Sequence, residues 1–350
     1  MRFSFLAGVI ALLLALAGGA TFVTLRAFNH FGEVENRFSG VCTPVTGVAG
    51  PEDIEPMAAT GRAFVSSLDR RAGPAARGAI YSVLVEDPLD SQNWRDRTAG
   101  APARFHPLGL NYFQNGDVRR LFVVNEAAKA VEIYSLDETG DLLHLESISE
   151  KRLTSPNEVI AVGPRSFYVT NDVEGGRSTW LGKAQFLTRA AAGKIYYFDG
   201  VSMRLAADGL RFANGVALNA AGTRLYAAET AGPSLRIYDR DLQTGALALA
   251  RVETLPAAPD NITIAWDGAL WIGAQPKPLM IPLFERNIQS KAPSLVIRYV
   301  DDKSAASPMT EIFSNDGAMI STASVAAVAG NRLLIGALLD DRYLICDLPG

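Results

Sequence analysis

A hairpin pattern that recurs six times constrains the fold of this chain more than any other feature of its sequence. In the clearest copy, residues 212–230, an apolar run is followed by a turn containing Asn219 and Gly222 and then by a second apolar run. Apolar runs at residues 234–238 and 247–255 complete a unit of four antiparallel strands. The other copies are spaced about 45 to 65 residues apart, as propeller blades are, and begin at Pro51, His106, Ser155, Pro259 and Thr322. The sequence therefore predicts an all-β protein, a six-bladed β-propeller over residues 40–350.

The last unit has apolar runs for only three strands before the chain reaches Gly350. Residues 40–48 lie upstream of the first unit and are predicted to supply the missing outer strand, which closes the ring. This closure would bring Cys42 and Cys346, the two cysteines of the chain, close enough to form a disulfide. Such a bond suits an oxidising compartment, whereas two buried free thiols are the alternative in a reducing one.

Residues 1–27 form a hydrophobic segment ahead of the predicted propeller. Residues 3–25 are almost entirely apolar, lie between Arg2 and Arg26, and as a helix would extend roughly 34 Å, enough to span a bilayer. We predict a hydrophobic helix that serves as a retained transmembrane anchor. A cleaved signal peptide is the alternative, because the small residues 17–20 offer a cleavage site, and a buried helix of the soluble domain is a third. The first two both make the protein membrane-anchored or secreted, with the propeller outside the cytoplasm.

The charge of the chain argues against one class of partner. Lys and Arg number 33 against 37 Asp and Glu, a formal net charge of −4, and the basic residues form no cluster. No nucleic-acid-binding signature is present. We therefore expect no nucleic acid as a partner.

Two insertions interrupt the regular spacing of the strands. Residues 174–192, between the second and third strands of the third unit, contain apolar and basic positions that predict an amphipathic helix. Residues 276–291 occupy the corresponding place in the fifth unit and carry a cluster of apolar side chains. Either both insertions fold down on the rim of the propeller, or they wall the mouth of the central channel and contact the membrane that holds the N-terminal segment.

Polar residues stand at the start of the first strand in most of the six units. In a propeller the first strand of each blade lines the central channel and the second returns antiparallel to it. The start of the first strand and the end of the second therefore share one mouth of the ring. The first-strand starts carry Glu52, Asp53, Leu108, Asn157, Glu158, Asn214, Asp260 and Asn261. The second-strand ends carry Asn125, Glu126, Asn171, Asp172, Glu229 and Gln275.

A ring of carboxylate and carboxamide oxygens without Cys or His suits a hard cation. Ca²⁺ fits best because it takes six to eight oxygen ligands in flexible geometry, whereas Mg²⁺ requires a tighter octahedron and Zn²⁺ prefers nitrogen or sulfur. The alternative is that these residues cap turns at strand starts. Their recurrence at one register favours the cation, because unpaired carboxylates facing one another in a channel would be costly.

The motifs EDIEP, SPNEVIAVGPRSFYVTND, FANGVAL and DNITI, together with the terminal cysteine pair, resemble those of the serum paraoxonase/arylesterase family. The similarity runs from about Cys42 to Cys346. The resemblance implies a six-bladed propeller with two calcium ions in its channel and with lactonase and arylesterase activity. More distantly, the chain is similar to gluconolactonase-type and strictosidine-synthase-like propellers.

Carried over residue by residue, the resemblance implies two sets of calcium ligands. The ligands of the catalytic ion would be Glu52, Asn157, Asn214, Asp260 and Asn261. The ligands of a deeper structural ion would be Asp53, Glu158 and the backbone carbonyl of Leu110. Glu158 departs from the family pattern, which has Asp there, and its extra methylene would weaken or shift the deeper ion. The resemblance also implies the Cys42–Cys346 bond and a retained N-terminal segment.

The histidines of the family are missing from this chain. The resemblance would place them at positions that here hold Leu108, Glu126 and Gln275. The three histidines of the sequence are His30, His106 and His144. The first lies beside the hydrophobic segment and the last in a predicted outer strand. His106 is predicted to be a partly exposed turn residue, with a catalytic replacement role as the alternative.

The lead hypothesis is a calcium-dependent hydrolase of carboxylic esters, of arylesterase or lactonase type. Ca²⁺ would polarise the substrate carbonyl for attack by water. Glu126 is the carboxylate left over to act as the base, with Asp260 next, and neighbouring carboxylates are expected to raise the pKa of Glu126 above about 4.3. The alternatives are a non-catalytic, calcium-stabilised, membrane-tethered binding propeller and a strictosidine-synthase-like enzyme. Asn261 begins a glycosylation sequon, and because it would face the metal we expect no glycan there.

Overall fold

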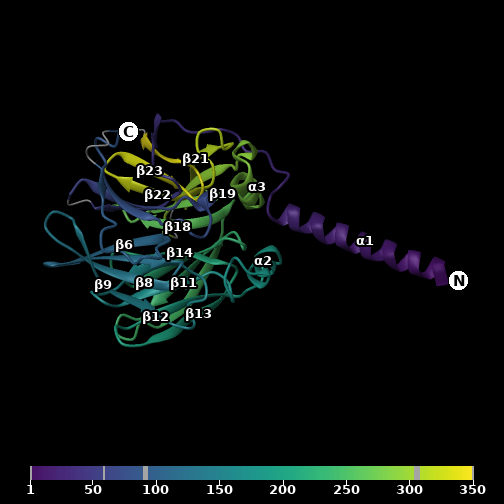
Figure 1. Cartoon of the computed structure of the whole chain (residues 1–350), viewed down its shortest axis with the longest axis horizontal. Coiled ribbons are helices and arrows are strands. Elements are labelled where there is room, and N and C mark those ends of the chain that lie inside the picture. Colours follow the sequence, from purple (N-terminus) through teal and green to yellow (C-terminus); the bar gives the residue numbers. More distant parts are fainter. Residues whose placement is uncertain (1, 58–59, 90–93, 303–307, 349–350) are drawn as a thin grey trace.

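Six four-stranded antiparallel sheets surround a central channel in the computed structural model (Figure 1). The structure describes residues 2–57, 60–89, 94–302 and 308–348. Residue 1 of the predicted hydrophobic segment and residues 349 and 350 of the predicted propeller lie outside the described residues. The predicted six-bladed propeller is confirmed.

Each blade runs from an inner strand to an outer strand. The first blade contains β2 (Pro51–Met57), β3 (Arg62–Ser67), β4 (Ala79–Leu84) and β5 (Arg95–Asp96). The second contains β6 (Pro107–Asn115), β7 (Val118–Asn125), β8 (Ala130–Leu136) and β9 (Leu142–Ser149). The third contains β10 (Pro156–Ala161), β11 (Phe167–Asn171), β12 (Gly193–Phe198) and β13 (Met203–Leu210). The fourth contains β14 (Ala213–Leu218), β15 (Arg224–Glu229), β16 (Ser234–Arg240) and β17 (Leu247–Thr254). The fifth contains β18 (Ala258–Ile264), β19 (Leu270–Gln275), β20 (Ser294–Tyr299) and β21 (Met309–Asn315). The sixth contains β22 (Ala323–Ala329), β23 (Arg332–Ala337), β24 (Arg342–Asp347) and β1 (Cys42–Thr46).

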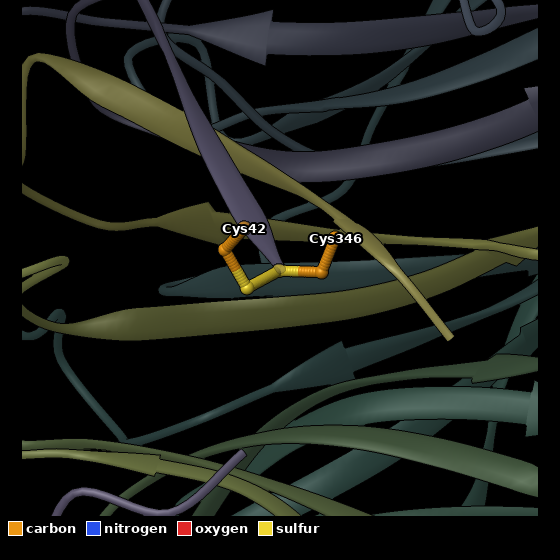
Figure 2. Close-up of a disulfide and its surroundings, with 2 residues drawn as sticks. All are labelled: Cys42 and Cys346. Atoms are coloured by element: carbon orange, nitrogen blue, oxygen red, sulfur yellow. A yellow bond between two sulfur atoms is a disulfide. The ribbon is translucent and has the colours of Figure 1, made fainter. Parts of the chain in front are cut away.

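The sixth blade takes its outer strand from the opposite end of the chain, as the sequence predicts. β1 pairs antiparallel with β24, and the register places Cys42 opposite Cys346. The two cysteines form a disulfide across a sequence separation of 304 residues (Figure 2). The predicted closing strand and the predicted bond are both confirmed.

The burial of each strand follows its position in the blade. The second strands β11, β19 and β23 are buried along nearly their whole length and are rich in apolar residues. The outer strand β9 alternates between exposed and more buried positions, because one of its faces meets solvent. Apolar side chains of adjacent blades pack together between the sheets. Ile237 of the fourth blade and Ile272 of the fifth, for example, belong to one buried cluster. This packing fixes the inner strands around the channel.

The N-terminal segment forms the long helix α1 (Arg2–Ala27), which projects away from the propeller (Figure 1). Its stretch Val9–Ala27 has a mean hydropathy of 2.0 and is not buried by the propeller, so it is long and apolar enough to cross a membrane. The exposure of this stretch is incompatible with the alternative of a buried helix in the soluble domain.

Both predicted insertions contain short helices, and in Figure 1 these lie on the side of the propeller from which α1 projects. The first insertion forms α2 (Trp180–Leu187). The second forms two 3₁₀ turns, Pro278–Met280 and Ile288–Ser290, on either side of α3 (Ile281–Arg286). Phe284 of α3 is buried on the rim against Leu339, whereas Trp180 of α2 is 80% exposed. The rim-packing alternative therefore holds for α3, and α2 leaves apolar surface uncovered.

Candidate functional site

Every inner strand begins with a β-bulge, and in the first, third, fourth and fifth blades the bulge lies where the sequence places polar residues. In the first blade Pro51 pairs with Ser67 and Ile54 with Val65, so β2 contains one residue more than β3 between these two pairs. The same irregularity occurs near the start of β6, β10, β14, β18 and β22. Side chains alternate between faces in a regular strand, and a bulge redirects them. Consecutive residues such as Glu52 and Asp53 can therefore both face the channel.

Four buried side-chain oxygens at these bulges accept no hydrogen bond from the described residues. These atoms, here called the mouth oxygens, are Glu52 Oε2, Asn157 Oδ1, Asn214 Oδ1 and Asn261 Oδ1. Buried polar atoms in proteins almost always have a partner, and a buried atom without one costs free energy. The mouth oxygens thus mark a place where the fold leaves acceptors available for a ligand.

The asparagines are oriented by their amide NH₂ groups, which leaves their oxygens free. Asn214 Nδ2 donates to Asp260 Oδ1 at 2.5 Å, and Asn261 Nδ2 donates to Glu52 Oε1 at 3.2 Å. Asn157 Nδ2 lies 3.4 Å from Asp172 Oδ2. The first two contacts join the first, fourth and fifth blades, whereas the third lies within the third blade, whose Arg177 is in electrostatic range of Glu52 and Asp260. The structure therefore brings together the residues that the sequence assigns to the catalytic ion.

Asp260 is held by two carboxamides rather than left free. In addition to the bond from Asn214, its Oδ2 accepts a hydrogen bond of 2.6 Å from Gln275 Nε2. Burial, together with the nearby charge of Glu52, raises the pKa of Asp260 to about 7 in the protein alone. A cation bound beside it would oppose that shift. Gln275, at a position where the resemblance implies a histidine, here holds Asp260 through this hydrogen bond.

A close approach of two blades brings Asn214 and Asp260 together. The next residue after Asn214 is Gly215, and a Cβ atom at this position would lie 2.4 Å from the backbone oxygen of Asp260. Only glycine leaves room for this contact between β14 and β18. The glycine of the FANGVAL motif thus positions the asparagine beside the neighbouring blade.

Arg177 connects two acidic side chains at the mouth and was not predicted from the sequence. Its Nη2 lies 2.7 Å from Asp172 Oδ2, and its Nε lies 3.3 Å from Glu126 Oε1. Arg177 is anchored by a hydrogen bond of 3.1 Å from Nη2 to the backbone oxygen of Pro156. Asp172 has one oxygen, Oδ1, that is buried without a partner among the described residues. Asp172 and Arg177 therefore belong to the site together with Glu126.

The ion pair with Arg177 reverses the expected pKa shift of Glu126. The positive charge of Arg177 lowers the pKa of this carboxyl below its ordinary value, outweighing the opposing effect of burial. The expectation that neighbouring carboxylates would raise this pKa is therefore wrong, because the attraction of the contacting guanidinium is the largest influence on Glu126. Glu126 is ionised at neutral pH and is a weaker base than a carboxylate with a raised pKa.

Arg70 is the second cation of the mouth. It lies in the 3₁₀ turn Arg70–Ala72 that follows β3, and its Nη1 donates to the backbone oxygen of Leu338 at 2.9 Å. Its Nη2 is buried and has no hydrogen-bond partner in the described part of the chain. The charges that act on Arg70 are those of Glu52, Glu126, Arg177 and Asp260. The guanidinium of Arg70 therefore lies within electrostatic range of the whole site.

The residues assigned to the deeper ion also come together. Asp53, Leu110 and Glu158 all line a cavity of about 700 Å³ that opens at the end of the channel opposite the mouth. Asp53 Oδ2 accepts a hydrogen bond of 2.6 Å from the amide of Leu110. Burial raises the pKa of both Asp53 and Glu158, and repulsion from Glu52 adds to the shift of Asp53 while repulsion from Asp53 adds to that of Glu158. A Cβ atom on Gly109 would lie 2.1 Å from Glu158 Oε1, so glycine leaves room for the longer acidic side chain.

Three residues expected at the mouth have a different role. Asn125, Asn171 and Glu229 end their second strands, but each accepts a hydrogen bond from the backbone amide just before the inner strand of its own blade. These amides belong to His106, Ser155 and Arg211. For these three residues the turn-capping alternative is correct. Side chains alternate along a strand, so Asn125 and Asn171 cannot point the same way as the adjacent Glu126 and Asp172.

His106 lies within electrostatic range of Glu126, whereas His144 lies on an outer strand and Leu108 lies in the apolar core. His106 is half-buried, and its Nε2 lies 2.8 Å from the backbone oxygen of Ala76. His144 lies on the outer strand β9, as predicted, with its Nε2 2.8 Å from Glu132 Oε2. Leu108 is 1% exposed and packs in the apolar core with Phe122. At the three positions where the resemblance implies histidines, the chain has Leu108, Glu126 and Gln275.

The donor set at the mouth fits a calcium ion. Among the described residues, no group of three or more His, Cys, Asp or Glu side chains is placed to hold a metal, so a cation at the mouth would depend on the asparagine oxygens. Neutral carboxamide oxygens combined with one or two carboxylates are ligands that Ca²⁺ accepts. The same set lacks the nitrogen and sulfur donors of a zinc site.

Known proteins resemble this chain in both sequence and fold. The chain is 28% identical to serum paraoxonase/arylesterase 2 of Homo sapiens, over 97% of this chain and 98% of that protein. The same figures apply to serum paraoxonase/arylesterase 1 of Rattus norvegicus. Among solved structures, a gluconolactonase from Xanthomonas campestris superposes with a TM-score of 0.59 at 16% identity, covering 90% of this chain and 94% of that one. A regucalcin from Agrobacterium tumefaciens, titled a calcium-binding protein, gives a TM-score of 0.53 at 14% identity, with coverages of 89% and 96%.

The structural matches show a shared propeller fold, and the sequence matches go further. The sequence profile of the family described as Arylesterase matches residues 59–348, which is most of the propeller. Similarity to the two paraoxonases extends over nearly the full length of all three chains. This chain belongs to the arylesterase family.

Proposed function

We propose that this protein is a calcium-dependent hydrolase of carboxylic esters or lactones that acts at the mouth of the propeller. The observation that carries the proposal is the set of four mouth oxygens, which are buried, come from four blades and have no partner in the described part of the chain. Membership of a family of esterases and lactonases supports the same chemistry. The full proposed ligand set is Glu52, Asn157, Asn214, Asp260 and Asn261. A second ion would be held by Asp53, Glu158 and the backbone carbonyl of Leu110.

Calcium, when bound, would supply a positive charge that polarises the substrate carbonyl and stabilises the oxyanion that develops. The remaining steps fall to side chains of the chain itself. Glu126 accepts the proton of the attacking water at one of its carboxylate oxygens. Arg177 holds Glu126 in place through its Nε and keeps it ionised, so that the proton acceptor is ready at neutral pH. Asp260 is the next candidate for the base if Glu126 is dispensable.

The ion pair of Glu126 also favours a second candidate function. A carboxylate with a lowered pKa is a weak base, and the family's histidines are absent from the mouth. A non-catalytic, calcium-stabilised binding propeller would need only the oxygens and the ring. Both candidates use a small-molecule ligand at the same mouth.

The proposed setting of the domain is extracytoplasmic. Residues 1–27 would act as an anchor or signal segment, and residues 40–350 would form the propeller. The disulfide supports an oxidising compartment, and the exposed apolar α1 supports a membrane role. Because α2 lies on the side from which α1 projects and exposes Trp180, a retained anchor would direct this side toward the bilayer (Figure 1).

The test is turnover on a panel of aryl esters and lactones with calcium, with a chelator, and after calcium is restored. Hydrolysis that disappears with the chelator and returns with calcium is the expected result. Calorimetric titration with calcium should be carried out on the same protein. Calcium binding without turnover on any member of the panel would favour the binding propeller, and absence of calcium binding would overturn both candidates.

A further inference from the structure

Arg70 is the cation of the mouth that has no carboxylate partner. Arg177 forms ion pairs with Asp172 and Glu126, whereas Arg70 forms none within 4.0 Å among the described residues. Its one hydrogen bond is made by Nη1, to the backbone oxygen of Leu338. Its Nη2 is buried without an acceptor. A guanidinium donor removed from water in this way is stabilised when an acceptor reaches it.

The backbone fixes Arg70 beside the start of the first inner strand. A Cβ atom on Gly50 would lie 3.1 Å from Arg70 Nη1, and Gly50 stands two residues before Glu52. The side chain is also within electrostatic range of Glu126 in the second blade and Asp260 in the fifth. Arg70 therefore faces the region that a substrate bound at the mouth oxygens would occupy.

When the proposed calcium is present, the charges of the mouth balance, but Arg70 is the cation that contacts none of the carboxylates in the described part of the chain. Glu52 and Asp260 would then be matched by the two positive charges of the ion. Asp172 and Glu126 are in contact with Arg177. Arg70 remains as a cation near these groups but not paired with any of them. The buried Nη2 donor of Arg70 is therefore left for an acceptor on the ligand.

We propose that the mouth selects esters or lactones that carry a carboxylate, and that Arg70 binds this carboxylate. The inference rests on the hydrolase function proposed above. A carboxylate is favoured over a phosphate because it carries the single charge that matches one free guanidinium. It also pairs with the planar donors of arginine. The carboxylate lies on the part of the substrate that does not react, so Arg70 determines specificity rather than performing the chemical step.

The experiment compares mono(4-nitrophenyl) succinate with its neutral methyl ester on the calcium-loaded, full-length protein. The two substrates differ in one charge, so the ratio of their kcat/KM values isolates recognition of the carboxylate. Wild type is expected to prefer the acid. Arg70→Met should reduce the acid-to-methyl-ester ratio by about 10- to 100-fold, which is the usual effect of removing a charge-assisted hydrogen bond. Arg70→Lys keeps the charge and should recover part of the preference.

Arg71→Met is the matched control. Arg71 is the next residue of the same turn, but it donates to the backbone oxygens of Phe284 and Leu339 and lies over the Phe284 ring at 4.5 Å. Its removal disturbs the turn without removing a cation that faces the mouth. The ratio should therefore stay at the wild-type value. If wild type does not distinguish the two substrates, or if Arg70→Met slows both equally, the proposal is wrong while the hydrolase function stands.

A binding measurement separates this inference from the hydrolase function. Succinanilic acid is the amide analogue of the acidic ester, and its methyl ester is the neutral partner. Calorimetry should give tighter binding of the acid to wild type and loss of that difference in Arg70→Met. This outcome supports carboxylate recognition even if neither nitrophenyl substrate is hydrolysed. Equal or undetectable binding of the two amides, in protein that hydrolyses neither ester, overturns it.

Discussion

The two ends of the central channel are made by the same six inner strands but differ in their backbone and chemistry. At the mouth each strand begins with a bulge, and the redirected residues supply the mouth oxygens. At the other end the pairing is regular, and aliphatic residues such as Val216 and Ile262 line much of the cavity. The difference teaches that polar chemistry is concentrated where strand pairing is interrupted. Regular pairing leaves side chains to alternate between core and channel.

The largest effect should come from removing a carboxylate at the mouth. Glu126→Gln removes the proposed base and should reduce turnover by about 10²- to 10⁴-fold, the usual contribution of general-base catalysis, without loss of calcium binding. Glu55→Gln is the matched change in the cavity at the other end. Burial raises the pKa of Glu55 to about 7, so a neutral amide there resembles the native group. Steady-state kinetics should place this variant within about twofold of wild type, since Glu55 is neither the proposed base nor one of the proposed calcium ligands.

Full activity in Glu126→Gln would show that the base lies elsewhere, and Asp260 would then be tested. Installing histidines at the corresponding family positions, as Leu108→His with Glu126→His, should increase ester or lactone hydrolysis. If this double variant and wild type are both inactive on the whole panel, the binding propeller is the better description.

Removing the disulfide, which lies on the side of the propeller opposite the mouth, should reduce the stability of the fold strongly without reducing the activity. β24 runs away from the mouth, and the disulfide joins its far end to the start of β1. Cys42→Ser should lower the free energy of unfolding by about 3 to 5 kcal/mol, because the bond closes a loop of several hundred residues. Urea unfolding measures this change, and calcium affinity should stay the same. Two alkylatable thiols in unreduced protein exported to an oxidising compartment would contradict the bond.

Calcium removal should have the next largest effect and should act at the mouth. An ion that binds only the folded state adds roughly 2.7 kcal/mol at a hundredfold excess over its Kd. Chelation should therefore lower the Tm by several degrees, because the proposed ligands join four blades. Scanning calorimetry in calcium and in EDTA measures the shift. Superimposable curves from protein verified to be metal-free in EDTA would rule out the site.

The smallest predicted effect is a shift in the pH dependence of kcat/KM. Arg177 lowers the pKa of Glu126, and the ionised form is the one that accepts a proton. The rate should therefore stay constant from neutral pH down through the ordinary pKa of a Glu side chain and fall only below it. Arg177→Met removes the positive charge, raises the pKa of Glu126 and should move the acid limb of kcat/KM to higher pH. If the acid limb of the kcat/KM profile does not shift in Arg177→Met, a group other than Glu126 determines it.

Sequence reasoning was most accurate where a residue belongs to the repeated unit. Six copies of one hairpin predict the blades, and polar residues at one register predict the first-strand starts. The bulges could not be foreseen, because Pro51 to Ile54 reads as a continuous strand and its register is decided by pairing with β3. Arg70 and Arg177 were missed because each lies in a segment outside the repeat, where no periodicity indicates which way a side chain points.

The prediction that the pKa of Glu126 is raised was wrong for the same reason. The predicted ring is acidic, but the group that decides the shift is an arginine some 50 residues later in the chain. The second-strand ends had a local signal that was available. Asn125 and Glu126 are adjacent, and alternation along a strand allows only one of them to face the channel.

A blade that takes its outer strand from residues 42–46 and its other three from residues 323–347 is completed only when almost the whole chain has been synthesised. Glu52 illustrates the consequence for the mouth. Its backbone oxygen accepts a hydrogen bond from Ser324 Oγ at 2.6 Å, and its side chain meets Asn261, so both partners emerge from the ribosome more than 200 residues later. Contacts this distant in sequence form late, because loop closure opposes them. The mouth oxygens are therefore assembled in the last steps of folding, and an ion bound there would distinguish finished rings from open ones.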